Sequence, residues 1–245
     1  MTTRLNVFVA RATGMSRRAA DDVIFEGRIR IGSEVVNEPG TQVEESDIVN
    51  YDGKRIRLPS EKTWLLMNKP IDFITTRKDE SGRKTVMEIL PKHLQRLFPV
   101  GRLDRDTEGV LLFTNDGETA HKLLHPSFEV ERQYRVLINK PLSFNEIELI
   151  QRGVFIDGKK TSPARIFHAR DSRPIYELTL TEGRYHEVKR IFAAVGREVL
   201  RLERTSHCGI TAGNLKPGEW RLLTSAEIDL MKSRLVHNYD SDRRT

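Results

Sequence analysis

The sequence predicts an α+β protein in two parts, a small amino-terminal domain and a larger domain built on a mixed, mainly antiparallel sheet. Three observations indicate this class. Strand-like segments outnumber helical ones in the second part, several of them are joined by hairpin turns, and a short polar segment with a proline separates the two parts. We expect domains at residues 1–58 and 63–237, a linker at 59–62 and a disordered polar tail at 238–245.

The composition is that of a globular protein with a basic balance. Its 245 residues suffice for one or two domains with a real core. The 41 Lys and Arg residues against 35 Asp and Glu give a formal charge of +6, which favours a polyanionic partner without identifying one. The single cysteine, Cys208, excludes an intramolecular disulfide and a cysteine-based zinc site, so we expect a reducing compartment, the cytoplasm. No segment approaches the ~20 apolar residues of a membrane span, and we expect no contact with a membrane.

The first domain begins with two short helices and a hairpin. Apolar residues recur at helical spacing from Leu5 to Ala12, and Gly14 ends that helix. Ser16 is a favourable N-cap for a second helix, and Gly27 is placed to end it in a left-handed conformation. Alternating segments on either side of Gly32-Ser33 then predict a two-residue hairpin.

Charge is unevenly distributed in this domain, although residues 1–60 carry nine basic and nine acidic side chains. A nucleic-acid contact must therefore come from a local patch at the start of the second helix and on the hairpin. The candidate RNA-binding residues are Arg17, Arg18, Arg28 and Arg30. A solvated helix face is the alternative interpretation.

The segments Met15–Ala20 and Glu26–Gly32 together resemble the αL RNA-binding module first seen in a small-subunit ribosomal protein. The resemblance covers residues 3–58, with Ile31 standing where the hairpin more often carries a polar residue. It implies RNA binding and leaves catalysis open.

The second domain alternates strands with a few helices. The pattern predicts strands at 64–67, 133–138, 164–169, 175–181, 199–202 and within 215–223, and helices at 85–90, 118–124, after Ser143, after Tyr185 and after a capping Ser225. Asp157-Gly158 is a strong signal for a hairpin turn. No dinucleotide or P-loop fingerprint occurs, so we expect no nucleotide cofactor. His121 and His125 stand one helical turn apart without a third ligand, so we expect no metal site.

A charged segment precedes the most apolar strand of this domain. The run Val110–Phe113 predicts a strand buried on both faces, and residues 101–109 before it carry five charged side chains. Loops anchored on packed elements often hold catalytic groups, although a solvated turn with self-compensating charges fits equally well. Asp104, Tyr134 and Lys189 could share a cleft, but no triad is compelled by the residues alone.

Residues Gly101–Gly117, with the sequence GRLDRDTEGVLLFTNDG, closely resemble the signature of the ribosomal-RNA pseudouridine synthases of the RsuA-like family. Three further matches follow the order of that family, namely Asn68–Pro70, Gln133–Val136 and Glu182–Phe192. The resemblance spans about residues 63–224. It implies that a uridine within RNA is isomerised without a metal or redox cofactor: the base leaves its sugar, turns and rejoins through carbon.

The resemblance also implies roles for individual residues. Asp104 corresponds to the catalytic carboxylate, Tyr134 to a residue that stacks on the base, and Lys189 to the basic partner of the aspartate. Whether the carboxylate adds covalently or removes a sugar proton stays open. The implied substrate-binding residues are Arg102, which either takes part in base flipping or supports the loop, together with Val188, Arg184 and His186.

The implied partner is ribosomal RNA or a pre-ribosomal particle, with the large subunit favoured, and we expect a monomer. The alternatives are a non-catalytic RNA-binding assembly factor, or the same reaction on small-subunit ribosomal RNA or on transfer RNA. Two positions depart from the family pattern: Lys189 stands where some members have arginine, and Glu187 replaces a glutamine.

Overall fold

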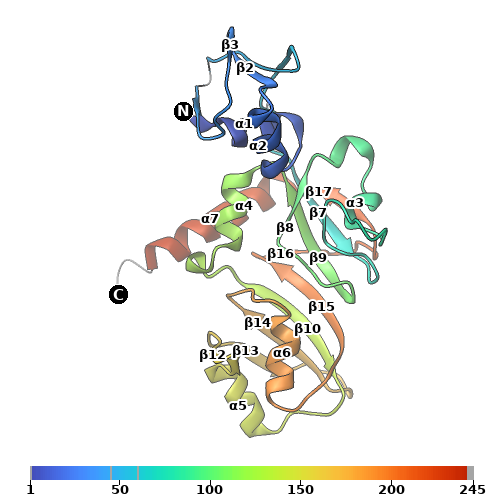
Figure 1. The fold of residues 1–245 in the computed structure, drawn as a ribbon. Helices are drawn as coiled ribbons and strands as arrows, with labels where there is room; N and C mark the ends of the chain where they lie inside the picture. Colours follow the sequence, from blue (N-terminus) through green and yellow to red (C-terminus); the bar gives the residue numbers. More distant parts are fainter. Residues whose placement is uncertain (1, 45, 60, 242–245) are drawn as a thin grey trace. The chain divides into compact units, whose positions relative to one another are not determined.

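The computed structural model describes residues 2–44, 46–59 and 61–241, and the chain divides into two units (Figure 1). The first unit ends at Lys62, where the predicted linker ends. It also includes Lys92–Leu97, a segment with one 3₁₀ turn, η1 (Lys92–Leu94), that we had assigned to the second domain. This segment belongs to the first unit because it packs closely against Gly14: a Cβ atom placed on Gly14 would lie 3.4 Å from Cβ of Arg96.

The first unit is built from α1 (Leu5–Thr13), α2 (Arg17–Phe25) and short strands. Both predicted helices are confirmed with their ends. The Gly14 N–H, at a positive φ of 79°, donates to the Ala10 carbonyl, and the Ser16 side chain accepts from the Ala19 N–H at 3.1 Å. Leu5, Val9 and Ile24 are among the residues of its core.

The predicted hairpin is also confirmed. Strands β2 (Ile29–Ile31) and β3 (Glu34–Val35) pair antiparallel around Gly32-Ser33, with Gly32 at a φ of 60°. In the described residues, β2 also pairs with β5 (Val49–Tyr51), which pairs with β6 (Lys54–Ile56), and β1 (Thr3–Arg4) pairs separately with β4 (Gln42–Val43).

Among the described residues of the second unit, nine strands form one sheet in which β13-β14-β10-β15-β9-β7-β17 are neighbours, while β16 pairs with β15 and β8 with β9. Their bounds are β7 (Trp64–Lys69), β8 (Phe98–Val100), β9 (Thr107–Thr114), β10 (Arg132–Ile138), β13 (Arg165–His168), β14 (Ile175–Leu180), β15 (Val199–His207), β16 (Ile210–Thr211) and β17 (Trp220–Leu222). The β15–β9 pair is parallel and the other pairs are antiparallel, which confirms the predicted mixed, mainly antiparallel sheet.

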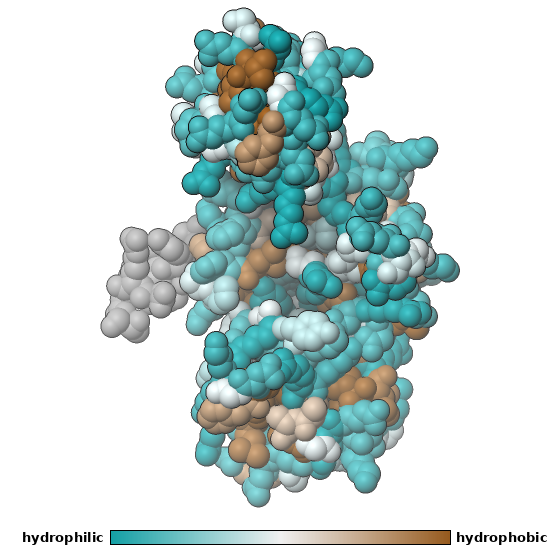
Figure 2. Space-filling view, in the orientation of Figure 1, coloured by the Kyte–Doolittle hydropathy of each residue, from teal (hydrophilic) through white to brown (hydrophobic). Residues whose placement is uncertain are grey.

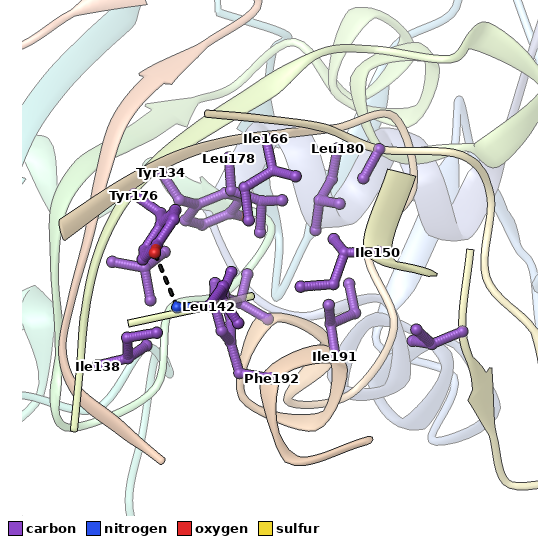
Figure 3. Close-up of a cluster of buried hydrophobic side chains, with 14 of the residues drawn as sticks. Tyr134, Ile138, Leu142, Ile150, Ile166, Tyr176, Leu178, Leu180, Ile191 and Phe192 are labelled. Atoms are coloured by element: carbon purple, nitrogen blue, oxygen red, sulfur yellow. Dashed lines mark hydrogen bonds between the residues drawn. The ribbon is translucent and has the colours of Figure 1, made fainter. Parts of the chain in front are cut away.

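Two hydrophobic clusters hold helices on this sheet. The helices of this unit are α3 (Val86–Ile89), α4 (Gly117–Leu124), α5 (Phe144–Arg152), α6 (Glu187–Ala194) and α7 (Ser225–Ser241), with a 3₁₀ turn η2 (Pro126–Phe128), and the two clusters include α4 to α7. One cluster joins α5 and α6 to the β10 and β14 strands; in it the Tyr176 hydroxyl accepts from the Leu142 N–H at 2.8 Å (Figure 3). The other cluster joins α4 and α7 to β7 and β9. Beside α6, the strands β11 (Phe155–Ile156) and β12 (Lys159–Lys160) form the hairpin predicted at Asp157-Gly158.

The central strand is longer than its apolar run predicts. All eight residues of β9 are buried, including the Thr107, Glu108 and Gly109 that we had placed in the charged loop. The Glu108 carboxylate is held inside by an ion pair with Arg201 of β15. Because this partner lies 93 positions away, the local sequence gave no sign that a glutamate could occupy a core strand.

The last helix differs from the prediction at both ends. The Thr224 side chain, not Ser225, accepts the capping hydrogen bond from the Glu227 N–H at 3.3 Å. At the other end α7 continues to Ser241, into the tail predicted as disordered, because neither glycine nor proline interrupts the chain after Ser225. The rest of that tail, 242–245, lies outside the described residues.

The surface is mostly polar. On the face shown in Figure 2, hydrophilic side chains predominate and hydrophobic ones occur in small separate groups. Within the described part of the chain, none of the helices combines the length and apolar character that crossing a bilayer requires.

Candidate active site

A cavity of about 560 Å³ lies in the second unit, between the loop that precedes β9, the start of α6 and the strands β10 and β15. Its lining includes the three predicted catalytic residues and all four predicted substrate-binding residues: Asp104, Tyr134, Lys189, Arg102, Val188, Arg184 and His186. The structure thus brings these residues together from segments that are up to 87 positions apart in the sequence, from Arg102 to Lys189.

A buried lysine anchors the loop that carries Asp104. Lys69, at the end of β7, is 0% exposed, and its Nζ donates to the carbonyls of Thr107 at 2.8 Å and Pro70 at 3.0 Å. A third, longer hydrogen bond of 3.4 Å reaches the Arg105 carbonyl. Burial lowers the pKa of Lys69 to about 8, although the nearby carboxylates, Asp104 first among them, oppose the shift. Lys69 therefore fixes the backbone of the loop on the side that follows Asp104.

A buried threonine holds the same loop from its other end. The Thr75 hydroxyl donates to the Leu103 carbonyl at 2.8 Å and lies 3.2 Å from the Leu103 N–H. The loop closes on itself through the Thr107 N–H, which donates to the Asp104 carbonyl at 3.1 Å. Together these contacts leave the Asp104 backbone little freedom, so its carboxylate has a fixed position on the cavity wall.

The Asp104 carboxylate lies between two basic side chains. Its Oδ1 is 3.2 Å from Nε2 of His186, and its Oδ2 is 3.3 Å from Nζ of Lys189. Lys189 is shared, because its Nζ also lies 2.6 Å from Oδ1 of Asp106. Partial burial alone would lower the pKa of Lys189, but the hydrogen bond to Asp106 and the charges of both aspartates raise it overall. A protonated ammonium group therefore faces Asp104 at neutral pH.

Tyr134 and Val188 also line the cavity. Tyr134 lies on β10 and is 8% exposed, and Val188 lies in the first turn of α6 and is 5% exposed. Both belong to the hydrophobic cluster under α6, where the Tyr134 ring lies beside Leu178 (Figure 3). An aromatic ring and an aliphatic side chain facing a carboxylate can hold a flat, partly polar ring such as a nucleobase.

The other predicted substrate-binding residues differ in whether their side chains are already engaged within the protein. Arg102 is exposed at the cavity. His186 adopts a left-handed conformation, with a φ of 50°, and its ring stacks on Tyr185 with centroids 3.9 Å apart. The Arg184 guanidinium, in contrast, is bound by Glu182 at 3.1 Å and by the Lys160 carbonyl at 2.8 Å. The structure therefore engages Arg184 in holding the β11–β12 hairpin.

The four arginines predicted to bind RNA also divide into two groups. Arg17 and Arg18 are exposed at the start of α2, and neither forms an ion pair within the described residues. Arg28 is held by Asp52 at 2.6 Å and by Glu26 at 3.1 Å, and these bonds raise its pKa above its usual value. Arg30 donates to the Ser33 carbonyl at 3.0 Å across its hairpin. Arg17 and Arg18 are thus the best placed to contact phosphates.

Sequence reasoning missed several residues that shape the site. Lys69 stood within a family match but was given no role, and Thr75 carried no signal at all. The residues alone also did not indicate the ion partners of Asp106 and Glu108, which pair with Lys189 and Arg201. The described residues contain no group of three or more His, Cys, Asp or Glu side chains placed to hold a metal ion.

An RNA-binding module followed by a sheet domain with a fixed aspartate in a basic cavity defines a class of RNA-modifying enzyme. The sequence model of the RNA pseudouridylate synthase family matches residues 63–194, and that of the S4 domain matches residues 3–49. The chain belongs to the RNA pseudouridylate synthase family and carries an S4 domain before its catalytic domain. This confirms the resemblance found in the sequence.

Individual relatives agree over almost the whole chain. The ribosomal large subunit pseudouridine synthase B of Bacillus subtilis is 34% identical over 238 residues, which are 96% of this chain and 97% of that protein. An uncharacterized RNA pseudouridine synthase of Aquifex aeolicus is 38% identical over 93% of each chain. A crystal structure of a pseudouridylate synthase superposes with a TM-score of 0.69 and 30% identity, covering 93% of this chain and 99% of that one.

Proposed function

We propose that this enzyme converts a specific uridine of large-subunit ribosomal RNA into pseudouridine, with Asp104 as the catalytic carboxylate. One observation supports this role above the others: Asp104 is the aspartate whose two oxygens meet both His186 and Lys189 at the cavity wall. The large subunit is favoured because the B. subtilis relative named for it matches along nearly its full length.

The geometry supports a division of tasks within the cavity. The target uridine leaves the RNA helix at a cost of a few kcal/mol, and its base enters between Tyr134 and Val188. Arg102 is available at the cavity to occupy the vacated position. Asp104 then acts at the sugar, either by adding to C1′ or by removing the proton of C2′. Lys69 and Thr75 keep that carboxylate in place during the reaction.

Binding of the RNA outside the cavity falls to the first unit. Arg17 and Arg18 carry guanidinium groups open to phosphates at the start of α2. The cavity is lined by one chain throughout, so the proposal requires only a monomer. A ribosomal RNA substrate, free or in a pre-ribosomal particle, places the enzyme in the cytoplasm.

The catalytic role is tested by tritium release from RNA labelled at C5 of uridine. Asp104→Asn should abolish release and leave RNA affinity nearly unchanged, because the variant keeps the shape of the cavity. Asp106→Asn is the matched control, since Asp106 lies in the same loop and shares Lys189 but is 71% exposed. It should retain most of the activity. Full activity of Asp104→Asn would refute the assignment.

The target is tested by mapping pseudouridines in a strain that lacks this protein. We expect one site, or a few neighbouring sites, to disappear from large-subunit ribosomal RNA. Loss of a site in small-subunit ribosomal RNA or transfer RNA instead would preserve the enzyme class and overturn the proposed substrate.

A further inference from the structure

Two arginines lie buried in the floor of the cavity. Arg204 is 2% exposed and Arg132 is 6% exposed, and both line the site. They lie on the neighbouring strands β15 and β10, where Arg204 pairs in register with Tyr134. Their guanidinium groups therefore belong to the protein interior next to the proposed binding site of the base.

Neither guanidinium has a carboxylate partner among the described residues. Arg204 donates through Nε to the Val110 carbonyl at 2.7 Å, and its buried Nη2 has no hydrogen-bond partner. Arg132 donates to the carbonyls of Leu123 at 2.9 Å and Val130 at 3.2 Å. No carboxylate neutralises either charge: Arg132 is met by backbone carbonyls, and Arg204 is met by one backbone carbonyl and by the Tyr134 side chain.

The arrangement contrasts with the other charged groups of this sheet. Arg201, three residues before Arg204 on the same strand, forms an ion pair with Glu108, and Arg135 on β10 pairs with Glu177 at 2.9 Å. The neighbouring His207 adds no further positive charge, because burial first and then the two arginines lower its pKa well below the usual value, which keeps it neutral. Arginine itself stays charged at neutral pH despite burial.

A buried cation without a counter-ion destabilises the folded state, so stability does not explain why two arginines lie at this cavity. The backbone around Arg204 is tightly fixed. A Cβ atom placed on Gly109 of β9 would lie 2.3 Å from the Arg204 carbonyl oxygen, so the two strands approach as closely as only a glycine allows. The backbone of Arg204 is thus fixed against β9, and its side chain is held there by the hydrogen bond from Nε to the Val110 carbonyl.

The reaction that we propose for this site generates the complementary charge. When the bond between N1 of uracil and C1′ of ribose breaks, its electron pair stays on the base. The detached uracil is then an anion whose charge is spread over N1, C5 and both carbonyl oxygens. When the base has turned, a pair from C5 forms the new bond to C1′, and C5 finally loses its proton to a base in the site.

We propose that Arg204, assisted by Arg132, stabilises this uracil anion through its fixed positive charge in the cavity lining beside Tyr134. The inference rests on the proposed function, since it needs the base to detach in this cavity. A preorganised charge in a site closed to water acts more strongly than the same charge in solution, and it needs no rearrangement as the anion forms. Arg204 acts on the detached base, whereas Asp104 acts on the sugar.

The test compares Arg204→Gln with Arg204→Lys under single-turnover conditions with enzyme in excess. The neutral variant should react about 100-fold more slowly than wild type with little change in RNA affinity, and the lysine variant, which keeps the charge, should recover part of the loss. Arg135→Gln, an exposed arginine on the opposite side of β10, should react at the wild-type rate. Thermal unfolding shows which variants are folded. If Arg204→Gln does not fold, Arg132→Gln serves in its place with a smaller expected loss.

A better leaving group gives a readout that a purely structural role would not change. Fluorine at C5 withdraws electrons and stabilises the detached uracil anion. The ratio of wild-type to Arg204→Gln rates should therefore be smaller for RNA with 5-fluorouridine at the target than for RNA with uridine, as measured by chromatography of carbon-linked products after nuclease digestion. Equal ratios, or a folded variant with the wild-type rate, would overturn the inference. A wild-type enzyme that makes no pseudouridine would instead refute the proposed function.

Discussion

The two units of this enzyme use their charged side chains in opposite ways. In the S4 unit, Arg17 and Arg18 are exposed at the start of α2, where they can contact a partner outside the protein. In the catalytic unit, Lys69 and Arg204 are buried and fixed by backbone carbonyls from other strands. In our proposal, the exposed arginines provide affinity for RNA, which dissolved salt weakens by screening. The buried lysine and arginine provide fixed positions and a fixed electric field for the reaction of the uridine.

Among the residues compared here, the largest effect should come from the buried Lys69, which anchors the loop that carries Asp104. Lys69→Met removes the hydrogen bonds to the carbonyls of Pro70, Arg105 and Thr107, so the Asp104 carboxylate loses its fixed position. We expect kcat to fall about 100-fold, since a displacement of about 1 Å in an active site has that effect. RNA affinity should change little.

Steady-state kinetics and RNA binding measure the two quantities separately. Lys122→Met, which removes an exposed lysine paired with Glu118 on α4, is the control and should behave as wild type. A Lys69→Met enzyme with unchanged kcat would show that the loop holds its shape without the lysine, and that this buried charge does not fix the geometry of the site.

A smaller effect, on stability, is expected at Glu187 in the first turn of α6. Burial, and then the neighbouring Glu182, raise the pKa of Glu187 to about 7 from its usual 4.5, although the Arg184 N–H opposes this. Between these two pH values the folded protein keeps a proton that the unfolded chain releases. Stability therefore falls as the pH rises from about 4.5 to 7, and it stays reduced above that range.

Glu187→Gln should remove this pH dependence, because glutamine is neutral and its oxygen can still accept from the Arg184 N–H, which Glu187 accepts at 2.9 Å. We expect a gain of about 1–3 kcal/mol in the free energy of unfolding at pH 8 and little gain at pH 4.5. Denaturant unfolding at both pH values measures it, with the exposed Glu198→Gln as control. An equal change at both pH values would contradict the account.

The smallest effect should be that of the exposed arginines. The double substitution Arg17→Ala with Arg18→Ala should weaken RNA binding about tenfold and reduce the slope of affinity against salt by up to about 2. Arg28→Ala should do less, because Asp52 and Glu26 already occupy its guanidinium. Neither change should alter kcat at saturating RNA. A lower kcat in the double variant would show that the S4 unit takes part in positioning the substrate.

The features predicted correctly from the sequence are those set by neighbouring residues. Ser16 and Ser143 mark helix starts because each side chain caps an amide three residues later. Asp157-Gly158 and Gly32-Ser33 mark hairpins because their backbone conformations select these residue types. Such signals need no knowledge of the rest of the chain.

The features that the sequence could not provide depend on distant partners. Glu108 lies in a core strand because Arg201 neutralises it, and Arg184 is engaged by the Lys160 carbonyl rather than left for substrate. The catalytic set itself was assembled from resemblance, since residue types alone could not separate Asp104 from Asp106. The structure distinguishes them by contact: Asp104 meets both His186 and Lys189, whereas Asp106 meets Lys189 on the exposed side of the loop.

A crystal structure of the Asp104→Asn enzyme bound to RNA that contains the target uridine would test the central claim most directly. The account predicts that the uridine is extruded, with its base between Tyr134 and Val188, its sugar beside residue 104, and Arg204 beneath the ring. An RNA bound with that uridine still stacked in its helix and the cavity unfilled would contradict it.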